Sequence, residues 1–450
     1  MSARYDLVVV GTGAAGGAIA RACRERGWRV AVVDGRPYGG TCANRGCDPK
    51  KVLVGVAHAF EQAQAFLGKG LWTDGLRMAW GELQTFKRSF TDPVPRAREE
   101  AYASAGIDCY HGRARFTGPT TLRIGDDRVE AAYLAIASGA RPAPLDVPGA
   151  EHVITSDDFL DLERLPASVA FIGGGYVSME FAHVTVRAGA RTTILHRGGR
   201  LLEGFDPDLA AALEERSREA GIDIELGAEV QGVTPNGNGG FDVTIAGTAG
   251  TRTVSAELVV HGAGRVPDID DLDLAAGGVE RGRRGIAVND RLQSTSNARV
   301  YAAGDAADSG LPPLTPVAGY EARIVTSNLL GEEARVDYGA VPSVAFTLPP
   351  LARVGLLEAE AREQGLEVEV RHASTADWYS SRRLAQPISA YKTLVDRRTG
   401  RLLGAHLFGP HADEVINIFA LAIRQRLTAK DLKQTLWAYP TNGSDIDYML

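Results

Sequence analysis

The chain has 450 residues, of which 44% are hydrophobic, and it carries four cysteines and a formal net charge of −7. This length and composition allow two to four domains with substantial cores, and the acidic balance argues against a nucleic-acid partner. Because no apolar run approaches the ~20 residues of a membrane span and the N-terminus lacks a signal-peptide layout, we expect a cytoplasmic protein without a membrane partner.

An apolar strand from Leu7 to Val10 leads into a glycine-rich turn at the start of the chain. Gly11, Gly13 and Gly16 form a GxGxxG pattern, whose glycines permit a tight turn and let a pyrophosphate approach the N-terminus of the following helix. Asp34 ends the next strand, where a carboxylate accepts a hydrogen bond from a ribose hydroxyl. These residues predict a βαβ dinucleotide site.

The next segment, GGTCANRGCDPKK from Gly39 to Lys51, holds two cysteines, Cys42 and Cys47. On a regular helix their Cα atoms would lie about 8.6 Å apart, too far for a disulfide. A disulfide therefore requires a distorted segment, and Gly46 provides the backbone freedom for one. A close cysteine pair in a reducing compartment is more often catalytic or metal-binding than structural. No further Cys or His lies near enough for a zinc site, and we expect no metal.

Asp48 and Pro49 suit the N-cap and the first position of a helix that starts after the second cysteine. Cys47 would then lie at the positive end of that helix, close to Lys50 and Lys51. Such surroundings favour the thiolate over the thiol. The pair is therefore predicted to be redox-active.

A proline- and glycine-rich stretch from Ala140 to His152 indicates a linker, and a second strand and glycine turn begin near Ser168. Gly173 and Gly175 belong to a second fingerprint whose last glycine is replaced by Ser178. The small serine still allows close packing of the helix on the strand. The order of strand, turn, helix and strand predicts a second dinucleotide site.

The strand after this turn ends at His196 and Arg197, with Arg200 nearby and no carboxylate at the ribose position. Arg197 would suit the 2′-phosphate of NADP, which favours NADP over NAD. The alternative is that both arginines are solvated surface charges, and nearby Glu203 weakens the NADP interpretation.

From about Gly264 the chain returns to motifs that suit the first domain, and past Tyr338 its pattern changes to short strands followed by helices. The strands from Val341 to Phe346 and from Tyr391 to Val395 indicate a third, α+β domain. The predicted fold class is α/β, with two Rossmann-like dinucleotide-binding domains and a C-terminal α+β domain.

Together these motifs resemble the class I pyridine nucleotide-disulfide oxidoreductases, the family of glutathione reductase, dihydrolipoyl dehydrogenase and mercuric reductase. The resemblance covers essentially the whole chain. Beyond the two fingerprints and the cysteine segment it includes Ala137-Ser138-Gly139, Gly264-Arg265-Val266-Pro267, Tyr301-Ala302-Ala303-Gly304-Asp305 and Leu314-Thr315-Pro316-Val317-Ala318. It implies an FAD-binding domain over residues 1–148 and 269–338, an NAD(P)-binding domain over 149–268, and a dimerisation domain over 339–450 of a homodimer.

The resemblance also assigns roles to residues. Cys47 would be the cysteine against the flavin of FAD, Cys42 the one that exchanges with substrate, Lys50 would pair with Glu180 beside the flavin, and Tyr176 would gate the nicotinamide pocket. The implied cofactor-binding set is Gly11, Gly13, Gly16, Asp34, Gly40, Thr41, Ser138, Gly139, Gly173, Gly175, Tyr176, Arg197, Gly264, Arg265, Gly304, Asp305, Val317 and Ala318.

The chain departs from the family near its C-terminus. Most disulfide-reducing relatives carry a His-Pro-Thr-x-Ser-Glu motif, whose histidine serves the partner subunit as acid and base, whereas this chain has Tyr439-Pro440-Thr441-Asn442-Gly443-Ser444-Asp445. A tyrosine ordinarily titrates near ~10 rather than ~6.5, so it is a poorer proton shuttle at neutral pH but can still donate a proton to a leaving thiolate. Alternatively Tyr439 only packs at the subunit interface.

The resulting interpretation is an enzyme that passes electrons from NADPH through FAD to a Cys42–Cys47 disulfide and on to a small disulfide or thiol acceptor. One alternative is a flavin-dependent reductase of a non-disulfide acceptor such as a quinone. Another is a redox-sensing flavoprotein. The sequence leaves the acceptor and the physiological direction open.

Overall fold

A computed structural model describes residues 3–247 and 250–450. The chain forms two compact units. The first unit comprises Met1–Pro49, Thr85–Ala143 and Gly264–Asp337, and the second comprises Lys50–Gln84, Pro144–Ala263 and Tyr338–Leu450. Each unit is therefore assembled from three separate stretches of sequence.

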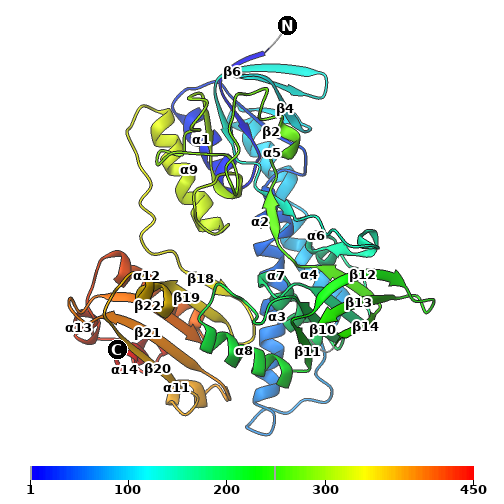
Figure 1. Ribbon diagram of the computed structural model, residues 1–450, viewed down its shortest axis with the longest axis vertical. Coiled ribbons are helices and arrows are strands. Elements are labelled where there is room, and N and C mark those ends of the chain that lie inside the picture. The colour runs from blue at the N-terminus through cyan, green and yellow to red at the C-terminus, as the bar shows by residue number, and fades with distance from the viewer. Residues whose placement is uncertain (1–2, 248–249) are drawn as a thin grey trace. The chain divides into compact units, whose positions relative to one another are not determined.

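The first unit is built on a seven-stranded sheet in the order β3-β2-β1-β6-β5-β4, with β17 pairing to β6. Strands β1, β2, β3, β6 and β17 run parallel, while β4 and β5 form an antiparallel extension. Helices α1 and α9 lie side by side against this sheet (Figure 1). The strand bounds are β1 Ala3–Val10, β2 Val30–Asp34, β3 Asp108–His111, β4 Ala114–Gly118, β5 Thr121–Ile124, β6 Asp127–Ile136, β7 Ala140–Pro142, β16 Arg265–Pro267 and β17 Val300–Ala302.

The helices that begin in or belong to this unit are α1 Ala14–Glu25, α2 Gly40–Arg45, α3 Cys47–Ala65, α5 Val94–Ser104, η2 Asp270–Leu272, η3 Gly304–Ala306 and α9 Thr315–Leu329. Helix α3 continues into the second unit, and α4 (Trp80–Thr91) leads back from it. The central strand β1 is buried on both faces, because Val8 and Val10 pack into one core cluster while Leu7 and Val9 pack into another. This explains why its sequence is a continuous apolar run rather than an alternating one.

The second unit contains a five-stranded parallel sheet in the order β11-β10-β9-β15-β8. A three-stranded antiparallel sheet, β12-β13-β14, follows β11 along the chain. The bounds are η1 Ala150–His152, β8 Ile154–Thr155, α6 Ser156–Leu160, β9 Ser168–Ile172, α7 Tyr176–Arg187, β10 Arg191–His196, α8 Pro207–Glu219, β11 Ile222–Leu226, β12 Glu229–Pro235, β13 Phe241–Gly247, β14 Gly250–Ala256 and β15 Leu258–His261.

The same unit ends in an antiparallel sheet in the order β18-β19-β22-β21-β20, covered by α12 (Figure 1). Val415, Ile416 and Phe419 of α12 are buried against it. Helix α8 packs on this sheet as well as on β11. The bounds are β18 Ser343–Ala345, β19 Leu351–Gly355, α10 Glu358–Glu363, β20 Val368–Ser374, α11 Tyr379–Arg382, β21 Ala390–Asp396, β22 Leu402–Phe408, α12 Ala412–Arg424, α13 Ala429–Lys433, η4 Asn442–Asp445 and α14 Ile446–Met449.

The predicted fold class is confirmed: one mainly parallel and one parallel sheet, each with a glycine turn after a central strand, accompany an antiparallel C-terminal sheet with helices. Both βαβ units have the expected order, β1–α1–β2 and β9–α7–β10. The predicted linker begins with β7, which pairs with β16. Across the described residues, no helix combines the length and apolar character needed to cross a membrane.

Candidate active site

The two cysteines lie on successive helices rather than on one. Helix α2 ends at Arg45, and Gly46 takes a non-helical conformation with φ −139° and ψ −115°. The expected interruption at Gly46 is therefore confirmed. The expected helix start is wrong: α3 begins at Cys47, which places Asp48 inside the first turn instead of at the N-cap. A glycine can make the sharp change of direction alone, so no further residue is needed between the two helices.

The Cys47 thiol lies at the N-termini of two helices. Cys47 is the first residue of α3, and its Sγ is 3.6 Å from Oγ1 of Thr315, the first residue of α9. The positive ends of both helix dipoles favour a negative charge on this sulfur. Both cysteines are free thiols in this structure.

The Cys42 thiol has a different environment. It is half-buried, and its Sγ donates a hydrogen bond to Oδ1 of Asp48 at 3.7 Å. A hydrogen bond with Cys47 and burial raise the pKa of the Cys42 thiol, and the charge on Asp48 raises it further. When the pair carries one negative charge, that charge is therefore better placed on Cys47 than on Cys42.

The ion pair expected between Lys50 and Glu180 is present, with Nζ 3.0 Å from Oε2. Lys51 binds the same oxygen at 2.6 Å, and the backbone N–H of Phe346 donates to Oε1 at 3.1 Å. Glu180 is buried, which by itself would raise its pKa, but Lys50 and Lys51 outweigh this and lower the pKa. The carboxylate therefore stays ionised, and three elements converge on it: α3, α7 and the segment after β18.

The residues assigned to FAD all belong to the first unit, and their surroundings suit a flavin dinucleotide. The turn after β1 closely approaches the start of α2, since a Cβ on Gly40 (φ +73°) would collide with Cα of Gly13. Ser138 presents a buried hydroxyl without a hydrogen-bond partner among the described residues. Burial raises the pKa of Asp305, partly opposed by Arg265. The pyrophosphate of FAD can bind the backbone N–H groups of this close glycine turn. Its ribityl chain can supply hydrogen-bond partners for the buried hydroxyl and the half-buried carboxyl.

Other members of this set lie at turns or in the first turn of a helix. Asp34 ends β2, and its carboxylate accepts hydrogen bonds from the backbone N–H and Oγ1 of Thr12 at 2.9 and 2.7 Å. Val317 and Ala318 are buried in the first turn of α9. The remaining positions lie directly after β1, in the first turn of α1, in α2, at the turns after β6 and β15, in β16 and in η3: Gly11, Gly16, Thr41, Gly139, Gly264, Arg265 and Gly304.

The second glycine turn connects β9 to α7, with Gly173 after the strand, Gly175 as the N-cap and Tyr176 as the first helical residue. His196, at the end of β10, accepts a hydrogen bond from the Gly174 N–H at 3.2 Å and so ties the turn to the next strand. Arg197 follows it and is exposed, and no ion pair of the described residues involves its guanidinium.

The loop after Arg197 holds the other two charged residues considered for nucleotide binding. Arg200 donates to the backbone carbonyl of Glu203 at 2.6 Å. The Glu203 carboxylate lies 3.7 Å from Nε2 of His196. Arg200 and Glu203 are thus engaged within the loop, whereas Arg197 points to solvent.

Tyr439 lies in the second unit and is 80% exposed. The acid of its motif, Asp445, lies near other residues: burial raises its pKa, and the charge of Arg383 opposes this only in part. Within the described part of the chain, no hydrogen bond joins Asp445 to Tyr439. The pairing of the motif's acid with its histidine, which the family resemblance implies, is therefore not reproduced by Asp445 and Tyr439.

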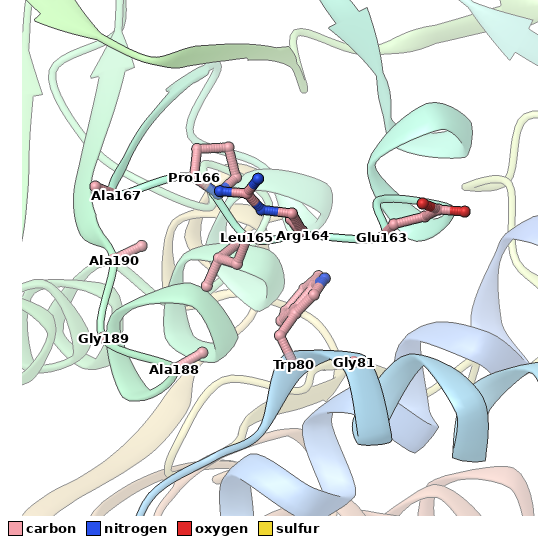
Figure 2. A pocket seen from close by; sticks show the side chains of 10 residues that line it. All are labelled: Trp80, Gly81, Glu163, Arg164, Leu165, Pro166, Ala167, Ala188, Gly189 and Ala190. Atoms are coloured by element: carbon pink, nitrogen blue, oxygen red, sulfur yellow. The ribbon is translucent and has the colours of Figure 1, made fainter.

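A separate pocket of about 430 Å³ lies in the second unit; Figure 2 shows the side chains that line it. It is lined by Trp80, Gly81, Glu163, Arg164, Leu165, Pro166, Ala167, Ala188, Gly189 and Ala190. The Trp80 ring is fixed by its indole N–H, which donates to the Leu162 carbonyl at 2.8 Å. None of the predicted site residues lines this pocket.

Comparison with known families decides the identity of the chain. Residues 5–322 match the family model described as pyridine nucleotide-disulphide oxidoreductase, and residues 341–449 match the dimerisation domain of the same family. The chain belongs to the pyridine nucleotide-disulphide oxidoreductases. It is an NAD(P)H-dependent flavoprotein disulfide oxidoreductase that uses FAD.

Relatives within this family cover nearly all of the chain. It is 32% identical to a mercuric reductase of Staphylococcus aureus, over 97% of this chain and 80% of the relative. It is also 32% identical to a glutathione reductase of Burkholderia cepacia and 30% identical to a dihydrolipoyl dehydrogenase of Bacillus subtilis, over 97% of this chain and 96% and 94% of the relatives.

Among solved structures, the chain is similar to the Cu(II) complex of the HOCl-induced flavoprotein disulfide reductase RclA from Escherichia coli. The TM-score is 0.89 at 27% identity, over 99% of this chain and 98% of that one. The mercuric reductase, the glutathione reductase and the dihydrolipoyl dehydrogenase are thus about equally similar to this oxidoreductase, so overall identity does not select an acceptor.

Three groups of this oxidoreductase were missed by the sequence analysis. Lys51, Thr315 and the Phe346 N–H contact Glu180 or Cys47, yet none was placed in the predicted site. The adjacent lysines and the Thr-Pro start of α9 were weak signals for the first two. Nothing in the sequence indicated the third, because a backbone donor carries no residue-specific mark.

Proposed function

We propose that this oxidoreductase transfers electrons from NADPH through FAD to the Cys42–Cys47 pair, which reduces a small disulfide in the cytoplasm. The observation that carries this proposal is the pair itself: two thiols brought together by a helix break, one of them at two helix N-termini. We keep the predicted division into an FAD domain (1–148 and 269–338), an NAD(P) domain (149–268) and a dimerisation domain (339–450) as part of it.

FAD would be held by the turn after β1, by Ser138 and by Asp305, whose unsatisfied or buried polar groups fit its pyrophosphate and ribityl chain. When bound, FAD supplies a two-electron carrier between the nicotinamide and the cysteine pair. Lys50 and Glu180 would stand beside the flavin, with the ammonium fixed by the buried carboxylate. Tyr176 would cover the nicotinamide pocket.

NADPH is favoured over NADH by Arg197, an exposed guanidinium directly after β10, where a 2′-phosphate would bind. Arg200 and Glu203 are bound within their loop. The Glu203 carboxylate is held beside His196, so it competes less for the ribose hydroxyl than the sequence suggested.

In the exchange, Cys42 forms a mixed disulfide with the acceptor and releases one thiolate, and Cys47 then attacks the Cys42 sulfur to release the second. Because the polypeptide exposes Cys47 more than Cys42, these roles require FAD to cover Cys47. Tyr439 of the partner subunit would donate a proton to the second of these leaving thiolates. Its exposure and that of Leu436, 98%, suit burial in a homodimer.

The test is anaerobic mixing of NADPH-reduced enzyme with a panel of acceptors. Glutathione disulfide, lipoamide and a quinone form one set. Cu²⁺ and Hg²⁺ form another, since one similar structure holds Cu(II) and one relative is a mercuric reductase. We expect turnover with a disulfide that is lost in Cys42→Ser. Turnover with a quinone alone, or turnover that survives Cys42→Ser, would contradict the proposal.

A further inference from the structure

The protonation state of Cys42 poses a chemical problem for the exchange reaction. Thiolates, not thiols, attack disulfides. Cys47, Asp48 and burial all raise the pKa of Cys42, so this residue holds its proton when the pair is reduced. The residue at the usual position of the family's histidine is Tyr439, and a tyrosine is a poor proton acceptor at neutral pH. The exchange therefore needs a base close to Cys42.

Asp48 is placed for that role. Its Oδ1 accepts the Cys42 thiol hydrogen bond at a separation of 3.7 Å, and both residues belong to the first unit. It lies in the first turn of α3, directly after Cys47. Asp48 is also exposed, so an acceptor that reaches Cys42 can reach this carboxylate as well.

We propose that Asp48 is a catalytic residue of the exchange reaction, which takes the proton from Cys42 and returns it to the departing thiolate. This inference rests on the proposed function of the cysteine pair. The sulfur of Cys42 forms a bond to one sulfur of the acceptor as its S–H proton passes to the Asp48 carboxylate. The acceptor's S–S bond breaks, and its other sulfur leaves with the electron pair of that bond and takes the proton from Asp48.

The first step therefore leaves the carboxylate as it began. In the second step the Cys47 thiolate attacks the Cys42 sulfur and forms the Cys42–Cys47 disulfide, and the second sulfur of the acceptor leaves as a thiolate that takes a proton from Tyr439 of the partner subunit, which regains one from water. In total the cysteine pair loses two electrons and one proton, water supplies the other proton, and the acceptor disulfide becomes two thiols. Proton transfer to Asp48 is uphill, but attack on the disulfide consumes the thiolate as it forms.

The variant Asp48→Asn tests this, because the amide keeps the size and the hydrogen-bond acceptor of the side chain but cannot carry the proton. NADPH-reduced enzyme is mixed in a single turnover with one of two disulfides. The thiolate that leaves 2-hydroxyethyl disulfide is basic and needs a proton, whereas the nitrobenzoate thiolate that leaves dithiobis-nitrobenzoate is stable without one.

We expect Asp48→Asn to slow oxidation by 2-hydroxyethyl disulfide about a hundredfold, the lower end of the 10²–10⁴ range for general acid–base catalysis. Oxidation by dithiobis-nitrobenzoate should slow much less, because its leaving thiolate needs no proton and because loss of the carboxylate lowers the pKa of Cys42, which offsets the loss of the base. Asp48→Glu should recover part of the lost rate. The matched control is Glu82→Gln, which removes an exposed carboxylate from the first turn of α4 and should change neither rate.

Equal slowing with both disulfides would overturn the inference and leave Asp48 a structural residue, with the proposed function intact. Wild-type enzyme that is oxidised only by the aromatic disulfide would also overturn it. If neither disulfide oxidises the wild type, the proposed function itself fails, and this outcome differs from any defect confined to the variant.

Discussion

Lys392→Met tests how much a buried charge cluster stabilises the second unit. The Lys392 side chain is 3% exposed, and its ammonium lies 2.9 Å from Oδ2 of Asp206, which is 0% exposed. It also pairs with Asp208 and, at 3.7 Å, with Glu358. Burial alone would lower the pKa of Lys392, but its hydrogen bond with Asp208 and its ion pair with Asp206 raise it, so the lysine is charged.

Removal of one partner from a buried ion pair leaves an uncompensated charge and costs about 3–5 kcal/mol. Lys392→Met leaves the Asp206 carboxylate in that state, while Asp206 still caps α8 through Oδ1. The double variant Lys392→Met/Asp206→Asn removes both charges and keeps a capping side chain. We therefore expect the double variant to recover at least half of the lost free energy of unfolding.

The assay is urea denaturation followed by tryptophan fluorescence, with the two single variants and the double variant in one thermodynamic cycle. Thr393→Val is the control, since it breaks a buried hydrogen bond to the Met449 carbonyl in the same strand without touching the ion pair. A loss below about 1 kcal/mol in Lys392→Met, or additive effects in the double variant, would refute the reasoning.

Three further predictions concern the nucleotide, the proton donor and acid stability. Arg197→Ala should weaken NADPH binding by about 1.5–3 kcal/mol, roughly ten- to a hundredfold, and leave NADH unaffected; equal loss with both in steady-state kinetics would make the residue structural. Tyr439→Phe should slow oxidation of the reduced pair by an aliphatic disulfide but not reduction of FAD by NADPH; stopped-flow traces in which both steps slow would show an architectural role. Burial lowers the pKa of His406 to about 4, so between pH about 6.5 and 4 the unfolded chain binds more protons than the folded chain, and stability is lost as the pH falls through that window. His406→Gln should therefore flatten the fall in melting temperature over this pH range, and an unchanged slope would contradict the prediction.

The sequence was sufficient for features set by local pattern. The two glycine turns, the helix break at Gly46 and the partnership of Lys50 with Glu180 are all present. Each depends on a short motif whose residue types are explained by their chemistry. For the ion pair, the family resemblance indicated Glu180 as the distant partner of Lys50.

The sequence did not predict the features that depend on packing between segments distant in the chain. Thr315 reaches Cys47 only because α9 begins beside α3, and the Phe346 N–H reaches Glu180 only because the segment after β18 packs on α7. The helix start was misplaced by two residues because a cap was assigned to Asp48, a good capping residue, although Gly46 had already ended the preceding helix. Asp48 instead faces Cys42, which no propensity rule indicates.

The central claim is that Cys47 lies against the flavin and exchanges electrons with it through the Cys42–Cys47 disulfide. Anaerobic titration of the FAD-loaded enzyme with NADPH tests this most directly. In the wild type we expect a long-wavelength charge-transfer absorbance from the Cys47 thiolate beside the oxidised flavin after uptake of two electrons. Cys42→Ser cannot form the disulfide, so its band should be present before NADPH is added, and Cys47→Ser should show no band at any stage. A wild-type enzyme that binds FAD and is reduced by NADPH without this band, or a band that survives Cys47→Ser, would contradict the account.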